Sequence, residues 1–309
     1  MGNKQLLGQF YTTSDPFAGS DAFSLWNSLR PKGVKVLEPF AGAGLLYSYL
    51  DEEWEGYDID PKIDSIIRQD TIKNFPIGYD VCITNPPYLA KTTISRKKLN
   101  VLIKYQDLYL DCLELMLNNC GYVAAIIPST FHNTGLFQDR LIAWDKLDKE
   151  VFSDTDVPVG VAYFAPKSKG TKVYVNGKEI KEHPPTNTNP SIAFNVSHGN
   201  YVLCAIDSTK GRSIHIHDNV EGFDREKYLK HTSRNYSLFY SPNKLDIDKI
   251  NSFIDEWRDE TRDFYLTSFK STMNCGIYRK RMNFNILKWI ISVYDCATNP
   301  SGTLDLHWQ

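Results

Sequence analysis

Short apolar runs alternate with polar turns along the first half of the chain. These runs have the length of β-strands, and they lie at residues 34–37, 55–60, 80–84, 122–127 and 157–164. Residues 106–118, which precede the fourth run, carry apolar side chains at helical spacing. Strands that alternate with helices predict an open, mainly parallel α/β sheet, which binds its ligands at the carboxyl ends of the strands.

The pattern changes after residue 166. An Asn-Gly pair separates two alternating runs within residues 171–180 and predicts a β-hairpin. Residues 183–200 predict a loop, and short strands at 201–206 and 213–217 precede helical patterns at about 246–263 and 283–296. A chain of 309 residues is about twice the length of a ~150-residue domain. We therefore expect two domains, residues 1–166 and a smaller α+β domain at 167–309.

The composition is that of an ordinary globular protein, with 42% hydrophobic and 23% charged residues. No apolar stretch is long enough to cross a membrane, and the first residues lack the apolar core of a secretory leader, so we expect a cytoplasmic protein. Residues 1–165 carry 15 basic and 21 acidic side chains, whereas residues 166–309 carry 20 and 16. The second half is therefore the better candidate for binding a polyanion.

Metal and disulfide chemistry are not indicated. The six cysteines form no CxxC pair, which argues against a disulfide framework or a structural zinc site. His215 and His217 would share one face of a strand, but the sequence offers no third ligand beside them. We expect surface histidines and no metal site.

The sequence Asn85-Pro86-Pro87-Tyr88 follows a predicted strand and carries the most specific chemistry in the chain. Two consecutive prolines remove two backbone donors and fix φ, so the neighbouring carbonyl groups stay rigid and accessible. An amide oxygen, a backbone carbonyl and an aromatic ring together form a receptor for a flat amine. The plainer alternative is a proline turn that ends a strand, with Tyr88 packed in the core.

Three acidic side chains precede this motif, each at the end of a predicted strand. Glu38 leads into a turn that contains Gly42 and Gly44, and it could pair with an ammonium group. Asp58 ends the next strand, where a carboxylate can accept from both hydroxyls of a ribose, and Asp70 lies about where a further strand, before residue 80, should end. Singly, each is more often a surface carboxylate. As an ordered set, they predict a site for a positively charged nucleoside.

Two stretches contain basic side chains and no acidic ones. The basic side chains of residues 81–106 follow NPPY, where we expect a loop beside the entering strand, and residues 264–294 interleave basic and aromatic side chains. Basic runs of this kind are often only solvated faces, but beside a site for a base they favour contacts with phosphate groups. The predicted DNA contacts are Lys91, Arg96, Lys97, Lys98, Arg279, Lys280 and Arg281.

The order of motifs resembles that of amino-directed DNA methyltransferases of the adenine-N6 type. The matching segments are GQFYT (8–12), LEPFAGAG (37–44), YDID (57–60), QDT (69–71), NPPY (85–88), GYVAAIIP (121–128) and VAYFAPK (161–167). The order is similar to the gamma group, in which the cofactor motifs precede NPPY and the target recognition domain comes last. The resemblance covers about residues 1–167. It implies a Rossmann-like methyltransferase sheet with helices on both faces, S-adenosylmethionine as cofactor and double-stranded DNA as partner.

The resemblance also implies roles for single residues at the cofactor. Glu38 would contact the methionine ammonium group, Asp58 the ribose and Asp70 the adenine ring. Residues 1–20 would close over the cofactor. The remaining members of the predicted cofactor site are Phe10, Tyr11, Thr12, Phe40, Gly42, Gly44 and Ile59.

At the target base, the resemblance implies that Asn85, Pro86 and Tyr88 hold a flipped adenine. Tyr88 would stack on one face of the base, and Phe164 matches the second stacking ring. Tyr163 lies beside Phe164, and a shift of one residue along the strand reverses which of the two faces the pocket.

We therefore expect a site-specific DNA adenine-N6 methyltransferase, which is either the modification enzyme of a restriction–modification system, with a cognate endonuclease as a separate protein, or a stand-alone methylase. The chain would act as a monomer or a weak dimer. A methyltransferase of the same fold that acts on RNA adenine or on a protein glutamine is one alternative. A catalytically inactive nucleic-acid-binding protein is another.

Overall fold

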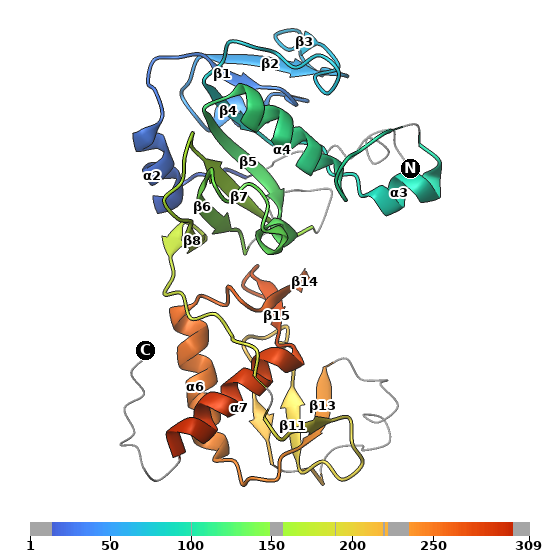
Figure 1. Cartoon of the computed structure of the whole chain (residues 1–309), viewed down its shortest axis with the longest axis vertical. Helices are drawn as coiled ribbons and strands as arrows, with labels where there is room; N and C mark the ends of the chain where they lie inside the picture. The colour runs from blue at the N-terminus through green and yellow to red at the C-terminus, as the bar shows by residue number, and fades with distance from the viewer. Residues whose placement is uncertain are drawn as a thin grey trace. The chain divides into compact units, whose positions relative to one another are not determined.

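The computed structural model describes residues 14–99, 101–148, 157–188, 190–218, 220–221 and 235–298. The chain divides into two compact units, residues 1–179 and 180–309 (Figure 1). Two units are what the sequence predicts, but the boundary follows Glu179 and not residue 166. The hairpin at the end of the first unit explains the difference, because its first strand pairs in parallel with residues 143–146 of the first sheet.

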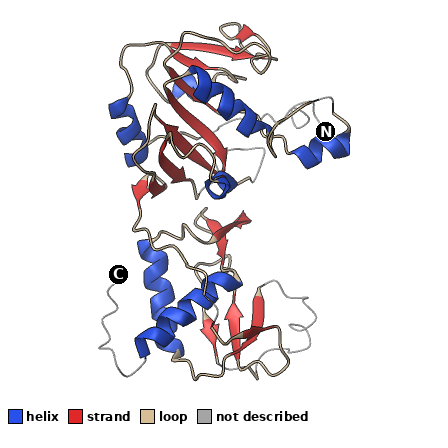
Figure 2. Cartoon of the chain, viewed as in Figure 1, coloured by secondary structure: helices blue, strands red, loops and turns tan. Residues whose placement is uncertain are grey.

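The first unit is built on a nine-stranded sheet in the described part of the chain, with the order β3-β2-β1-β4-β5-β7-β6-β8-β9. Figure 2 distinguishes the strands of this unit from its helices by colour. The strands are β1 (Val36–Glu38), β2 (Trp54–Asp58), β3 (Ile67–Arg68), β4 (Val81–Thr84), β5 (Tyr122–Pro128), β6 (Leu141–Lys146), β7 (Val159–Phe164), β8 (Lys172–Val175) and β9 (Lys178–Glu179). The helices are α2 (Asp21–Leu29), α3 (Lys91–Lys97) and α4 (Leu108–Asn119), with 3₁₀ turns η1 (Leu45–Ser48) and η2 (Ser129–Thr134).

Strands β3, β2, β1, β4 and β5 run parallel to their neighbours in this order. Strand β7 runs antiparallel to both β5 and β6. The order of strands along the chain reverses between β1 and β4, and ligands of open α/β sheets bind at such a switch point. The predicted fold class, an open and mainly parallel Rossmann-like sheet, is confirmed.

Helices cover both faces of this sheet. The indole of Trp26 in α2 lies 5.9 Å from the ring of Tyr163, whereas the Met116 sulfur in α4 lies 3.5 Å from that of Cys82. The strand register aligns Cys82 with Val123 and Val123 with Phe164, one residue along from Tyr163. Because successive side chains of a strand point to opposite faces, α2 and α4 pack on opposite faces.

The second unit combines helices with antiparallel strands. Its four-stranded sheet has the order β10-β13-β11-β12, and β14 and β15 form a separate two-stranded ribbon. The elements are β10 (Ala193–Phe194), β11 (Tyr201–Cys204), β12 (Ile216–His217), β13 (Tyr236–Tyr240), α6 (Ile247–Glu260), β14 (Thr267–Thr272), β15 (Tyr278–Arg281) and α7 (Phe284–Thr298). Trp257 of α6 and Ile290 of α7 are fully buried in the core of this unit. The predicted α+β class and both predicted helices are confirmed.

Among the described residues, no helix combines the length and the apolar content that crossing a lipid bilayer requires.

Candidate functional site

The carboxyl ends of four parallel strands carry the acidic residues and NPPY. Asp70 follows β3, Asp58 ends β2, Glu38 ends β1 and Asn85 follows β4. The strand order β3-β2-β1-β4 therefore arranges these residues in that sequence along one edge of the sheet. Neighbouring strands lie about 4.8 Å apart, so the four strand ends span on the order of 14 Å. Glu38 and Asn85 lie on the two sides of the switch point.

Glu38 is a buried carboxyl group. The residue is 2% exposed, and its Oε2 atom has no hydrogen-bond partner among the described residues. Burial, followed by the nearby charge of Asp58, raises the pKa of Glu38 well above its ordinary value. A buried and unsatisfied carboxyl group destabilises the fold, and a cationic ligand would remove that penalty. This arrangement fits the ammonium group of the predicted cofactor.

Asp58 holds the glycine turn that follows β1. Its Oδ2 accepts a hydrogen bond from the Gly42 amide at 2.8 Å, and its Oδ1 accepts from the Asp60 amide at 2.7 Å. Gly42 and Gly44 have φ angles of 56° and 67°, in the left-handed region that favours glycine. Each carboxylate oxygen has two lone pairs, so these bonds still allow a contact to a ribose hydroxyl.

The remaining predicted cofactor residues lie around the same edge or outside the described chain. Asp70 lies beyond β3 and forms an ion pair with Lys73 at 2.9 Å. Ile59 follows β2 and is 49% exposed, so it offers an apolar surface next to Asp58, while Phe40 is half-buried. Residues 10–12 lie outside the described residues, and their predicted role stays a prediction.

Tyr47 is a site residue that the sequence analysis missed. Its hydroxyl is buried without a hydrogen-bond partner among the described residues. Burial, and then the charge of Glu38, raises the pKa of Tyr47. A Cβ atom on Gly56 would lie 1.7 Å from this hydroxyl, so the phenol occupies the space above Gly56. A glycine within a predicted strand was the available clue, because it often indicates such a close approach.

The NPPY segment is held by Tyr88. The Tyr88 hydroxyl lies 2.6 Å from Asn85 Oδ1 and 2.7 Å from the Ile126 carbonyl oxygen. Its ring packs edge-on against Tyr109 with 6.1 Å between centroids, and the residue is 8% exposed. The prediction that Tyr88 presents a ring to a target base is therefore wrong for this structure. Core packing of the ring, the plainer alternative, is what the structure has.

Asp107 supports the same segment and was not predicted. Its Oδ1 accepts a hydrogen bond from the Leu89 amide at 2.8 Å, and its backbone forms an isolated bridge with Ala90. Burial raises the pKa of Asp107 above its ordinary value. The backbone at residues 89 and 90, directly after NPPY, is therefore held against the start of α4.

Phe164 does not lie at the NPPY edge, and its predicted stacking role is wrong. Because β7 runs antiparallel to β5, Phe164 pairs with Val123 near the start of β5, while Val159 pairs with Pro128 at its carboxyl end. Phe164 is fully buried and packs 6.1 Å from Phe131. Tyr163 is equally buried on the opposite face of the sheet. The start of β7, and not its end, lies beside the carboxyl end of β5.

Of the predicted DNA contacts after NPPY, three lie on α3 and Lys98 caps its carboxyl end. Lys91, Arg96 and Lys98 are exposed and Lys97 is half-buried. None of the four forms an ion pair with another residue in the described ranges. The structure therefore keeps them as candidates for phosphate contacts, although they lie on a helix where the sequence analysis expected a loop.

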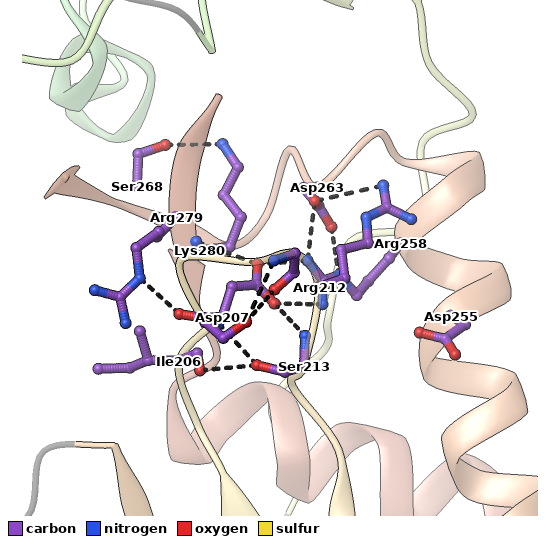
Figure 3. Close-up of polar contacts among 12 residues, drawn as sticks. Ile206, Asp207, Arg212, Ser213, Asp255, Arg258, Asp263, Ser268, Arg279 and Lys280 are labelled. Atoms are coloured by element: carbon purple, nitrogen blue, oxygen red, sulfur yellow. Dashed lines mark hydrogen bonds and ion pairs between the residues drawn. The ribbon is translucent and has the colours of Figure 1, made fainter. Parts of the chain in front are cut away.

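The neighbouring basic side chains of β15 point to opposite faces of the strand, as Arg279 and Lys280 do in Figure 3. Lys280 is fully buried, and its Nζ donates to Ser268 Oγ at 3.0 Å. Arg279 is half-buried and donates from Nε to the Asp207 carbonyl at 2.6 Å, while Arg281 is exposed. The predicted phosphate contact of Lys280 is wrong, because alternation along the strand turns this side chain inward.

Figure 3 also shows the ion cluster to which β15 is attached. The guanidinium of Arg258 bonds both oxygens of Asp207, at 3.0 and 2.7 Å, and pairs with Asp263 at 2.7 Å. All three residues are buried, and the Asp207 amide bonds the Lys280 carbonyl at 3.0 Å. This cluster links the ribbon to α6. Within the described part of the chain, no group of three His, Cys, Asp or Glu side chains is arranged to hold a metal ion.

The sheet order, the reversed β7 and the acid-ended parallel strands define an open α/β protein of the Rossmann-like fold class. Residues 22–154 match the model of the Eco57I restriction-modification methylase family. This match confirms, over that part of the chain, the resemblance predicted from the motifs.

This chain is also similar to individual proteins. The modification methylase CviBIII of Paramecium bursaria Chlorella virus NC1A is 23% identical over 185 residues, which cover 49% of this chain and 49% of that protein. The chain thus spans about half the length of this curated relative. A type I restriction-modification methyltransferase subunit from Streptococcus thermophilus is 15% identical with a TM-score of 0.41, covering 58% of this chain and 50% of that one. A modification subunit of a type I restriction enzyme from Vibrio vulnificus YJ016 is 13% identical with a TM-score of 0.37, covering 90% and 59%.

Proposed function

We propose that this protein is an S-adenosylmethionine-dependent DNA adenine-N6 methyltransferase of a restriction–modification system. The observation that carries the proposal is the order Asp70, Asp58, Glu38 and Asn85 along one edge of the sheet. Three acids are followed by an acceptor for an amine, across the switch point where such sheets bind ligands. The family match over residues 22–154 supports the same reaction class.

The cofactor would lie along the acidic part of this edge. Glu38 would pair with its ammonium group, Asp58 would accept from its ribose, and Ile59 and Asp70 would contact its adenine ring. When bound, the cofactor supplies an electrophilic methyl group. The unsatisfied Glu38 Oε2 and Tyr47 hydroxyl support this placement, because buried polar atoms are costly unless a partner satisfies them.

The target amine would bind at NPPY. The lone pair of adenine N6 is delocalised into the ring, which makes this nitrogen a poor nucleophile. Hydrogen bonds from the amine to Asn85 Oδ1 and to the Pro86 carbonyl would favour a pyramidal nitrogen whose lone pair is localised. Direct transfer then depends on positioning and on preorganised acceptors. The base has to leave the helix to reach this edge.

DNA would be held by basic side chains of both units. Lys91, Arg96, Lys97 and Lys98 follow the catalytic segment, and Arg281 is exposed on the ribbon of the second unit. The assignment of the second unit to target recognition is part of this proposal. The cytoplasmic location, the separate endonuclease and the oligomeric state also stay predictions.

The test is methyl transfer by the purified chain. Unmethylated genomic DNA is incubated with S-adenosylmethionine that carries an isotopically labelled methyl group, and the DNA is digested for nucleoside mass spectrometry. We expect labelled N6-methyladenine, located by sequencing at a defined site. Asn85→Ala should lower the rate on the order of 100-fold or more without weakening cofactor binding. Asn119→Ala, a change at the exposed end of α4, is the matched control and should retain the wild-type rate.

Parallel reactions with RNA and with protein extract distinguish the alternatives. Label in RNA adenine or in a protein glutamine, and none in DNA, would replace the proposed substrate. Binding of DNA without cofactor binding or methyl transfer would favour the non-enzymatic alternative.

A further inference from the structure

Directly after NPPY the chain leaves the edge of the sheet and returns to the start of α4, and we call this detour an excursion. Ala90 and Asp107 pair as an isolated antiparallel bridge, the Lys91 amide donates to the Gln106 carbonyl at 2.9 Å, and the Leu108 amide bonds the Leu89 carbonyl at 3.2 Å. Helix α3 forms the first half of the excursion and lies beyond the amino-terminal end of α4 in Figure 1. We call this segment the α3 excursion, described at residues 90–99 and 101–107. Its base is fixed next to the target-binding segment.

The returning half of the excursion is attached to α4. Asp111 Oδ1 accepts from the Lys104 amide at 2.7 Å, and the Tyr105 hydroxyl donates to Glu114 Oε1 at 3.0 Å. The Lys104 ammonium group forms an ion pair with Glu114 at 2.5 Å. These contacts fix the backbone two residues after Leu102. The segment that carries Leu102 is therefore anchored to α4.

The surface of the excursion suits a polyanion. Residues 81–106 contain no acidic side chain, and the cations of α3 form no ion pair with the described residues. The one cation of the segment that is neutralised, Lys104, lies on the returning half. An unneutralised group of cations beside a site for an adenine fits the phosphates of the strand that carries that adenine.

Leu102 is the exception on this cationic surface. It is 97% exposed, the highest value among the exposed large hydrophobic residues of the described chain, while Val101 and Ile103 beside it are half-buried. Single exposed leucines are common and need no function by themselves. This one stands on an anchored segment that begins at NPPY and is otherwise basic. Apolar side chains that enter DNA do so from basic surfaces of this kind, as wedges between base steps.

We propose that Leu102 enters the base stack beside the target adenine when that adenine leaves the helix. The proposal rests on the proposed function, since it assigns a residue to base extrusion at the same site. Extrusion breaks stacking and pairing at the target. Burial of an aliphatic side chain between the neighbouring bases offsets part of that cost, because Leu102 is almost fully in contact with water in the free protein.

The experiment compares two duplexes with the site at which the wild-type protein methylates DNA. In the first, the target adenine is paired with thymine. In the second, an abasic site replaces that thymine, so the adenine starts without a partner. Leu102→Ala should lower kcat/KM on the paired duplex by about tenfold and on the abasic duplex by about twofold or less. With 2-aminopurine at the target position, the same variant should show a smaller fluorescence increase on the paired duplex.

Two further variants serve as controls. Leu102→Met keeps a long apolar side chain and should restore most of the rate on the paired duplex. Ile77→Ala removes a side chain that is 78% exposed at the opposite end of β4, and it should behave as wild type on both duplexes. A wild-type rate for Leu102→Ala on the paired duplex would overturn the proposal, as would an equal loss on both duplexes. Absence of N6-methyladenine from genomic DNA incubated with the wild type and cofactor, so that no site can be placed in a duplex, would overturn the proposed function itself.

Discussion

The Tyr88 hydroxyl lies between two acceptors, Asn85 Oδ1 at 2.6 Å and the Ile126 carbonyl oxygen at 2.7 Å. A phenol has one hydrogen, so it donates to only one of these oxygens at a time. The first bond orients the Asn85 carboxamide within the turn after β4, and the second connects that turn to the neighbouring strand β5. The carboxamide that would accept the target amine is therefore oriented by a buried tyrosine of its own motif.

Tyr88→Phe tests this positioning role, because it removes the hydroxyl and keeps the ring. We expect kcat to fall by about tenfold, since Asn85 loses a group that orients its amide. The affinity for S-adenosylmethionine should stay at the wild-type value in calorimetry. Tyr88→Ala should cost more, because it also leaves a cavity against Tyr109. An unchanged kcat for Tyr88→Phe would show that only the ring matters.

Glu38→Gln should separate stability from cofactor binding. The wild-type carboxyl is buried and its Oε2 is unsatisfied, so an uncharged amide at this position removes the cost of a buried charge. We expect a melting temperature at pH 8 that is higher than that of the wild type. The same variant should bind S-adenosylmethionine on the order of tenfold or more weakly, because its ammonium group loses an anionic partner. A variant that is less stable, with unchanged affinity, would contradict the assignment.

The pH dependence follows from the same carboxyl group. The folded-state pKa of Glu38 is raised above the ordinary value of 4.5, so its contribution to stability is fully present below that value. That contribution is lost as the pH rises through the raised pKa. The difference in melting temperature between Glu38→Gln and the wild type should therefore increase with pH above about 4.5. A difference that stays constant from pH 5 to pH 8 would contradict the raised pKa.

The sequence predicted the strand ends better than the strand directions. Glu38, Asp58 and Asn85 could be predicted to share an edge, because parallel strands bring their carboxyl ends to one side. An apolar run such as residues 159–164 has the same pattern in either direction. Only pairing with β5 and β6 shows that β7 is reversed, which moves Phe164 away from the site.

The second unit shows a similar limit. Three consecutive basic residues predict a cationic surface, but strand alternation turns Lys280 inward. Its backbone amide donates a hydrogen bond to the carboxylate of Asp207, which lies 73 positions earlier in the chain. Such a partner is recognisable only after folding. The domain boundary was misplaced for a related reason, since the predicted hairpin pairs with a strand at 141–146 that the sequence analysis did not predict.

Gly56→Ala should displace Tyr47. The new Cβ would lie 1.7 Å from the Tyr47 hydroxyl and 3.1 Å from the ring carbon that carries it. We expect a loss of about 1–3 kcal/mol in the free energy of unfolding, because the overlap forces the ring to move. Tyr47→Phe removes the overlapping oxygen, so the double variant should recover most of that loss. Chemical denaturation of the two single variants and the double variant measures the coupling, and additive effects would contradict the contact.

Lys280→Met and Arg281→Ala should have opposite consequences, although the residues are neighbours. Lys280 is fully buried on the face of β15 that bonds Ser268, so its replacement should change stability and leave the salt dependence of DNA binding unaltered. Arg281 is exposed and forms no ion pair among the described residues, so its replacement should leave the melting temperature unchanged. If Arg281 contacts one phosphate, its loss should reduce the slope of log K against log salt by about 0.9 on duplex DNA.

Binding is measured by fluorescence anisotropy over a range of salt concentrations, on duplexes with the methylated site and with a scrambled one. An equal loss of affinity on both duplexes indicates a phosphate contact. A loss of discrimination between them, with an unchanged slope, would instead assign Arg281 to a base edge. If neither the slope nor the discrimination changes, the exposed face of the ribbon does not contact DNA.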